Sequence, residues 1–287
     1  MSNFYQPGSP DKTTTMKILF FGDVFGKMGR LALVKELPKI KKKWRPDLTL
    51  ANVENMAHGK GVTIKTLRQL SEAGIDAFTS GDHFWSKKEE LDKIKKLEIP
   101  IIRPDNFKGK LAGRGHLVIK CNKKNVLLVN LMGRTFSKYQ DERGVSTLAN
   151  PFKVADKILK KYPRVKIKIV DFHGEATSEK VSLGHYLNGR VSAILGTHTH
   201  IPTADEQTLS RGTAYITDVG MVGPKDSVIG VEKTVILDRF LHDIFTGPIK
   251  MEIPETGSAV INGVVVEIDD KTGQAKKISR INQETLI

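Results

Sequence analysis

Carboxylate, amide and imidazole side chains follow five apolar segments of this chain, each at the point where a β-strand would end. The five segments are KILFFG, LTLANV, AFTSG, KIVDF and AILGT. The residues that follow them are Asp23, Glu54, Asn55, Asp82, His83, His173, His198 and His200. Strand ends converge on the ligand crevice of an open α/β sheet, so we expect these side chains to meet.

The donor types in this set suit divalent metals. Carboxylate, amide and imidazole donors without a thiolate favour iron, manganese, cobalt or zinc. A single zinc ion needs only about four ligands, so the surplus of donors predicts two metals. His198 and His200 point to the same side of an extended segment, because residues i and i+2 share a face. Both imidazoles could then reach metals about 3.5 to 4 Å apart.

Two adjacent cations need an anion between them, and Glu54 is the best bridging candidate because it ends a buried-looking strand. A shared water or hydroxide would be the second bridge and would be a nucleophile at neutral pH. Phosphodiester hydrolysis is the obvious use of such a centre. The leaving alkoxide needs a proton, and His83, next to the candidate ligand Asp82, is placed to act as the general acid.

Each of these residues also has a structural interpretation. A single strand-end aspartate such as Asp23 is more often a turn residue or a helix N-cap. Asn55 could bond its own backbone, and His173 could be a hydrogen-bonded core histidine. His83 could be a ligand or a structural residue. The occurrence of all of them at successive strand ends favours the metal site.

Apolar β-branched segments alternate with amphipathic patterns, which predicts an α/β fold. The expected strands are Lys17–Gly22, Leu48–Val53, Ala77–Ser80, Ile99–Arg103, Val126–Leu131, Ile167–Phe172, Ala193–Gly196 and Ala214–Thr217. The expected helices are Arg30–Lys43, Ile64–Ala73, Lys87–Leu97, Pro151–Lys161 and Ser178–Leu187. The last third has few helical signals and looks antiparallel around Val260–Ile268. We predict one domain over residues 16–287, preceded by a disordered leader or extension over residues 1–15.

Composition narrows the possible classes of protein. The 287 residues include 39% hydrophobic and 27% charged residues, and no apolar stretch approaches the length of a membrane span. The single cysteine, Cys121, cannot form an internal disulfide and is expected to be inert, which favours a cytoplasmic location. The net charge of +14 favours anionic partners such as phosphodiesters or RNA, although single lysines on helix faces often only solubilise a chain.

Six ordered motifs resemble the YmdB-like branch of the calcineurin-like metallophosphoesterases. They are GDVFGKMGR, ANVENMAHGKG, TSGDHFW, DFHGEATSEK, GTHTHIPTADE and TAYITDVGMVGPKDSVIG. The resemblance runs from about Met16 to the C-terminus. It implies an α/β/β/α sandwich and an activity similar to that of 2',3'-cyclic-nucleotide phosphodiesterases.

The resemblance also implies a distribution of ligands between two metals. One metal would be held by Asp23, Glu54, Asn55 and His200. Glu54 would bridge to the second metal, with His83 as the proton donor, and the other ligands of that metal would be Asp82, His173 and His198.

The chain departs from the wider pattern at two positions. Phe25 stands where most of the superfamily has a histidine, and Asn55 would supply the missing donor, as in the YmdB-like branch. The family's usual GNH is GDH here, so Asp82 replaces an asparagine. The extra negative charge predicts tighter metal binding and a changed metal preference or pH optimum.

Other polar residues are expected to lie outside the metal site. His58 and His116 are predicted to be surface or pocket residues, while His185 and His242 are predicted to be structural. The polar stretch Arg134–Asn150 is long for a plain connection and could be a lid. Arg103 or Arg134 could hold a phosphate or form a surface salt bridge.

Three functions remain open at this stage. The leading one is a phosphodiesterase acting on a small phosphodiester. The alternatives are an RNA nuclease or phosphomonoesterase, and a metal-loaded regulatory protein with weak turnover. A homo-oligomer is compatible with the antiparallel C-terminal third.

Overall fold

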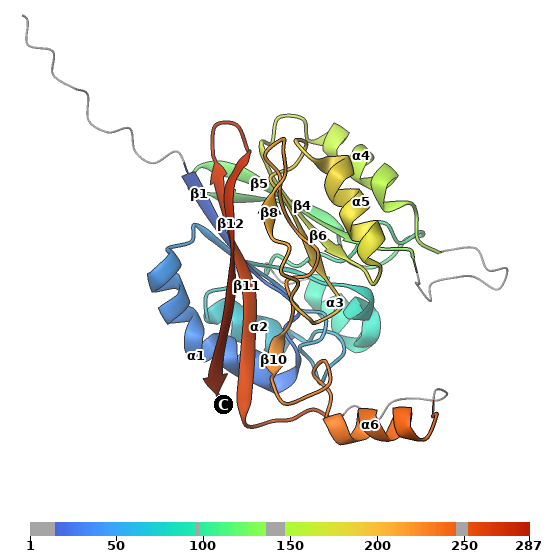
Figure 1. Ribbon diagram of the computed structural model, residues 1–287. Helices are drawn as coiled ribbons and strands as arrows, with labels where there is room; N and C mark the ends of the chain where they lie inside the picture. Colours follow the sequence, from blue (N-terminus) through green and yellow to red (C-terminus); the bar gives the residue numbers. More distant parts are fainter. Residues whose placement is uncertain (1–14, 96–97, 136–146, 245–251) are drawn as a thin grey trace, which may run out of the picture.

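Two six-stranded sheets form the centre of the computed structural model, which describes residues 15–95, 98–135, 147–244 and 252–287 (Figure 1). The first sheet has the order β10-β11-β1-β2-β3, with β12 paired to β11. Its strands are β1 (Thr15–Phe21), β2 (Leu48–Asn52), β3 (Ala77–Thr79), β10 (Val222–Pro224), β11 (Ser258–Asp269) and β12 (Ala275–Leu286). The strands β1, β2 and β3 are parallel, so their carboxyl ends lie at the same edge.

The second sheet has the order β4-β5-β6-β7-β9-β8. Its strands are β4 (His116–Cys121), β5 (Lys124–Met132), β6 (Ile167–His173), β7 (Ala193–Thr197), β8 (Gln207–Thr208) and β9 (Ala214–Ile216). The run β5-β6-β7-β9 is parallel, which is typical of a sheet covered by crossover helices.

Helices cover the outer face of each sheet. Those on the first sheet are α1 (Gly26–Trp44), α2 (Ile64–Glu72) and α3 (Lys88–Lys95), and those on the second are α4 (Pro151–Lys161) and α5 (Thr177–Leu187). Residues such as Phe20, Leu50 and Leu128 fill the core between the sheets. Leu33 and Leu183 belong to the separate cores under the helices. The molecule is therefore an α/β/β/α sandwich, as predicted.

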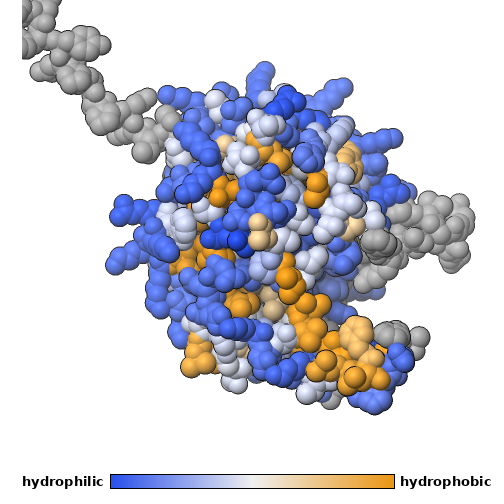
Figure 2. Space-filling view, in the orientation of Figure 1, coloured by the Kyte–Doolittle hydropathy of each residue, from blue (hydrophilic) through white to orange (hydrophobic). Residues whose placement is uncertain are grey.

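The antiparallel C-terminal third is confirmed by the pairing of β11 with both β1 and β12. The expectation of few helical elements there needs a correction, because Lys233–Leu241 form helix α6. None of its residues is buried, and Phe240 and Leu241 are exposed. The segment is nine residues long and has no side-chain N-cap, so it lacks the usual start signal of a helix in the sequence. Figure 2 shows apolar side chains on the surface where α6 lies.

One predicted strand is wrong. Ile101 and Ile102 form only isolated bridges, to Phe78 and Arg114, in place of a strand over Ile99–Arg103. Pro100 lies within the predicted strand and Pro104 directly follows it, and neither has an amide N–H to extend the ladder. The other seven predicted strands and all five predicted helices are present with ends shifted by a few residues.

Three predicted segments lie partly outside the described residues, and one is the helix Lys87–Leu97, of which 96 and 97 are not described. The proposed leader covers residues 1–15, of which only Thr15 is described, as the first residue of β1. The proposed lid over Arg134–Asn150 includes 136–146, which are outside the description. Within the described residues, no helix is long and apolar enough to cross a membrane.

Candidate metal centre

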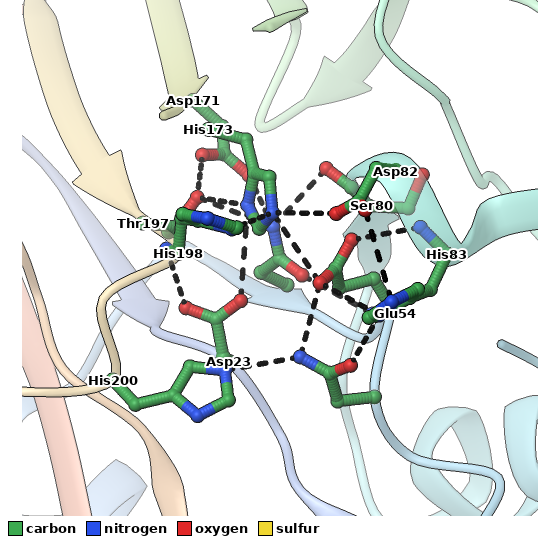
Figure 3. A network of polar contacts seen from close by, with 12 residues as sticks. Asp23, Glu54, Ser80, Asp82, His83, Asp171, His173, Thr197, His198 and His200 are labelled. Carbon is green, nitrogen blue, oxygen red and sulfur yellow. Dashed lines mark hydrogen bonds and ion pairs between the residues drawn. The ribbon is translucent and has the colours of Figure 1, made fainter. Parts of the chain in front are cut away.

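The candidate ligands come together where the carboxyl ends of the two sheets meet (Figure 3). Strand β1 leads to Asp23, β2 leads to Glu54 and Asn55, and β3 leads to a 3-10 helix, Asp82–Ser86. From the other sheet, β6 ends at His173 and β7 precedes His198 and His200. The extended conformation predicted for these two histidines is wrong, because both have positive φ angles. Neither sheet alone could assemble this set.

Four donors form the tightest part of the cluster. One ligand atom from each of Glu54, Asp82, His173 and His198 lies within 4.8 Å of all the others. His173 Nε2 is at the centre, 3.0 Å from His198 Nδ1, 3.3 Å from Glu54 Oε1 and 3.6 Å from Asp82 Oδ1. Two carboxylates and two imidazoles are a donor set that fits one divalent cation.

The remaining donors adjoin Glu54 on its other side. Asn55 Nδ2 donates to Glu54 Oε1 at 3.0 Å and lies 3.1 Å from His200 Nε2. Asp23 Oδ2 accepts from the His198 backbone N–H at 3.0 Å. Asn55 directs its amide nitrogen at His200 and its oxygen at His83, so it would have to present Oδ1 to act as a ligand. Glu54 thus lies between the four-donor cluster and the remaining donors, which form the two halves of the site.

The carboxylate of Asp23 has a buried oxygen, Oδ1, that is suited to bind a cation. Its side chain is fully buried, and Oδ1 accepts no hydrogen bond from the residues that the structure describes. Oδ1 lies 3.8 Å from His173 Nδ1. A buried carboxylate oxygen is costly unless a donor or cation faces it, so a metal ion fits this position.

The neighbours of His173 and His200 orient their rings for metal binding. Thr197 Oγ1 donates to Asp171 at 2.7 Å, so its lone pair accepts the Nδ1–H of His173 at 2.9 Å. His200 Nδ1 donates to the carbonyl of Ile229 at 2.7 Å. Both rings then carry a proton on Nδ1 and direct Nε2 into the cluster, where it would bind a metal in its unprotonated form. Burial opposes protonation of His173, but Glu54 and Asp82 raise its pKa well above the usual value, so a metal would take the place of the Nε2 proton.

The electrostatics of the site favour the ionised forms of Glu54 and Asp82, whereas burial raises the pKa of Asp23. Burial opposes the charge of Glu54, but the imidazoles of His173 and His83 hold its pKa well below the usual range. Burial and Glu54 raise the pKa of Asp82, and contacts with His173 and His83 outweigh them and bring it to about 2. Burial and the nearby His173 lower the pKa of His198 to about 4. Anionic acids and a neutral imidazole are the ligating forms.

His83 lies at the edge of the cluster and is its most accessible imidazole after His198, with 22% of the side chain exposed. Its Nδ1 lies 2.9 Å from Asn55 Oδ1, and Nε2 lies 3.7 Å from Asp82 Oδ2. Burial opposes its protonation, but hydrogen bonding and charge from Glu54 raise its pKa above the usual value. A partly exposed, protonated imidazole is suited to donate a proton to a bound molecule.

The loop after β3 has no room for a side chain at Gly81. A Cβ there would lie 2.1 Å from Glu54 Oε2 and 2.4 Å from His173 Nε2. Glycine therefore lets the backbone before Asp82 pass directly against two of the donors.

The other polar residues considered from the sequence lie elsewhere. His58 is exposed, and His116 pairs with Asp105 at 2.7 Å. Arg103 is buried and donates to the Pro104 carbonyl, which corrects the surface interpretation. Cys121 is a free thiol that donates to the Asp47 carbonyl, and burial raises its pKa, in keeping with the predicted inertness.

Sequence reasoning missed the residues behind the cluster. Asp171 and Thr197 orient His173, and Asn52 Nδ2 donates to Asp171 Oδ2 at 2.9 Å. A signal was present, since Asp171 and Asn52 are polar residues in otherwise apolar strands, each two positions from a candidate ligand. Their alternation with the core residues could have indicated that they support the site.

A model of the YmdB-like protein family matches residues 19–281. This chain belongs to the YmdB-like family. It is 44% identical over 268 residues to the 2',3'-cyclic-nucleotide 2'-phosphodiesterase of Bacillus subtilis, covering 93% of this chain and 96% of that one. The resemblance stated from the six motifs is confirmed.

Two solved structures that are similar to this chain in sequence also share its fold. A hypothetical protein of Thermus thermophilus has a TM-score of 0.84 and 37% identity, covering 94% of this chain and 99% of that one. A novel phosphatase of Mycoplasma pneumoniae has a TM-score of 0.85 and 36% identity, covering 94% of each chain. The metallophosphoesterase sandwich expected from the sequence is therefore confirmed.

Proposed function

We propose that this YmdB-like protein is a metal-dependent phosphodiesterase that hydrolyses small phosphodiesters, with 2',3'-cyclic nucleotides as the substrate class. The observation that carries this proposal is the convergence of Glu54, Asp82, His173 and His198 within 4.8 Å. The name of the Bacillus subtilis relative supports the substrate class. The net charge of +14 favours an anionic substrate.

We propose two metal ions, with Glu54 as the shared ligand. Asp23, Asn55 and His200 would complete one site, and Asp82, His173 and His198 the other. Iron and manganese suit this oxygen and nitrogen donor set best, while zinc or cobalt would also be accepted. When bound, the metals supply Lewis acidity and a hydroxide nucleophile at neutral pH.

The side chains of the protein contribute orientation and a proton. Thr197 and Ile229 hold His173 and His200 in their ligating tautomers. His83 stands beside the donors, and hydrogen bonding and charge from Glu54 raise its pKa against the effect of burial, which favours the protonated ring. His83 would transfer this proton to the leaving alkoxide as the P–O bond breaks.

Phosphomonoester hydrolysis is the second candidate, because the similar Mycoplasma pneumoniae protein is described as a phosphatase. RNA cleavage, a regulatory role with weak turnover, a homo-oligomer and a cytoplasmic location stay predictions. Product analysis separates the enzymatic alternatives, since a diesterase leaves a monoester and a monoesterase releases inorganic phosphate.

The test is hydrolysis of 2',3'-cyclic AMP by native protein, His83→Ala and Glu54→Ala, each with measured metal content. Native protein is expected to bind about two metals per chain and turn over. Glu54→Ala should lose metal, whereas His83→Ala should keep metal and lose about 10²- to 10⁴-fold in kcat. A native protein that binds two metals and cleaves no diester would refute the proposed function and retain the metal site.

A further inference from the structure

The loop that carries His198 and His200 has an unfavourable backbone. Both histidines have positive φ angles, 106° for His198 and 67° for His200. Residues with a Cβ avoid this region and are found there only where the surrounding structure holds them. The loop therefore needs an anchor that holds both imidazoles in place.

A buried ion pair lies directly behind this loop. Lys180 on α5 is 1% exposed, Asp218 after β9 is fully buried, and Lys180 Nζ lies 2.7 Å from Asp218 Oδ2. Neither residue belongs to the set of donors predicted from the sequence. An ion pair in such a place is expensive to desolvate, so its contribution to stability does not by itself explain its presence.

The pair binds the loop backbone on both sides of His198. Lys180 Nζ donates to the Thr197 carbonyl at 2.8 Å, and Asp218 Oδ2 accepts from the Thr199 N–H at 3.0 Å. Asp218 Oδ1 accepts from the N–H of Gly220 at 2.8 Å. The two charges thus fix the peptide groups that flank the histidine and join them to α5 and to the segment after β9.

We propose that Lys180 and Asp218 are positioning residues that lock the loop of residues 197–200 in its ligating conformation, a role that rests on the proposed metal centre. Neither side chain touches the metal or the substrate. They act through the Thr197 carbonyl and the Thr199 amide, and so hold one imidazole for each half of the centre.

The experiment is a titration of metal-free protein with Mn²⁺, in which the electron paramagnetic resonance signal reports free Mn²⁺. Lys180→Met is expected to weaken Mn²⁺ binding by about 10- to 100-fold, the range seen when groups behind a metal ligand are removed. Arg190→Met is the matched control, because it breaks the exposed pair of Arg190 and Asp156 just beyond α5. The control should bind Mn²⁺ as the native protein does.

A second variant covers the case in which Lys180→Met does not fold, since it leaves Asp218 buried without its partner. Lys180→Met with Asp218→Asn removes both charges and keeps an oxygen for the Thr199 N–H. Its Mn²⁺ affinity should still be reduced, because the Thr197 carbonyl has lost the bond from Lys180 and keeps only the longer one from the Gly174 N–H at 3.2 Å. Native affinity in either folded variant would overturn the positioning role.

Two further results complete the test. If neither variant folds, hydrogen exchange in native metal-free protein decides: an amide of Thr199 as protected as those of β7 is expected, and rapid exchange would overturn the proposal. A native protein that binds no Mn²⁺ would instead refute the metal centre. The two failures are therefore distinguishable.

Discussion

At the scale of single residues, the chemistry of the site depends on neighbours that never touch a substrate. The Thr197 hydroxyl and the Ile229 carbonyl set the protonated nitrogen of two imidazoles. Gly81 allows the backbone to pass against Glu54 and His173. Such contacts fix which ring nitrogen of each histidine faces the other donors.

Asp82 stands where the resemblance to the family implies an asparagine. Asp82→Asn should weaken Mn²⁺ binding several-fold, because the donor set loses one negative charge. The less neutralised metals should also shift the pH optimum of diester hydrolysis downwards. Metal titration and a pH–rate profile measure both effects.

Asp156→Asn is the control for this substitution, because it removes an exposed carboxylate on α4 that pairs with Arg190. It should leave both measurements unchanged. If Asp82→Asn has the same Mn²⁺ affinity and the same pH profile as the native protein, the charge of Asp82 has no role in the centre.

At the scale of elements, each strand delivers its donors because its apolar residues fix it in one of the cores. Helices behind the second sheet provide rigidity without contributing a metal donor. Helix α4 begins with Pro151, and the Asn150 side chain accepts from the Phe152 N–H at 2.9 Å and the Lys153 N–H at 3.3 Å. This cap satisfies backbone donors that the helix itself leaves unpaired.

Asn150→Ala should lower the free energy of unfolding by about 1 kcal/mol, the usual cost of losing an N-cap. Its metal content should stay native, because α4 packs on the face of the sheet away from the site. Urea denaturation followed by circular dichroism measures the change. Gln207→Ala, which removes an exposed 3.4 Å bond from Gln207 Nε2 to the Asp205 carbonyl, is the comparison and should cost less.

At the scale of the whole molecule, the net charge makes the stability of the fold depend on pH. The chain carries a net charge of +14 at neutral pH, and protonation of its carboxylates in acid increases the self-repulsion. Carboxylates that accept hydrogen bonds in the fold resist this protonation. Asp205 accepts from the Thr203 hydroxyl at 2.6 Å and from the Thr217 N–H at 3.1 Å, and so joins two segments near β9.

Burial opposes the ionisation of Asp205, but its bonds to Thr203 and Thr217 lower its pKa below the usual value. The folded state therefore favours the carboxylate, and this stabilisation is present above the unfolded pKa of about 3.9 and is lost as the pH falls below it. Asp205→Asn should destabilise the protein by about 1 kcal/mol at pH 7 and by less at pH 3. Urea unfolding at both pH values checks this, and an equal difference at both would contradict it.

The sequence by itself determined the layers and the identity of the donors. Apolar runs with polar residues at their ends indicate strands such as β1 and β6. A buried strand needs apolar residues, and a ligand at its end needs a carboxylate or imidazole, so both can be recognised in the sequence. The strand predicted over Ile99–Arg103 is wrong, because its composition suits a strand but Pro100 and Pro104 have no N–H to extend the ladder. Helix α6 is not predicted because it is only nine residues long and has no side-chain N-cap.

Only the tertiary structure decided which residues support the donors. Asp171 and Thr197 come from neighbouring strands, and Lys180 and Asp218 come from a helix and a loop that are 38 residues apart. Their contacts depend on strand register and on the placement of α5, which no local pattern encodes. The physical reason is that a ligand is recognised by its own side-chain type, whereas a supporting residue is defined by what it touches in the folded chain.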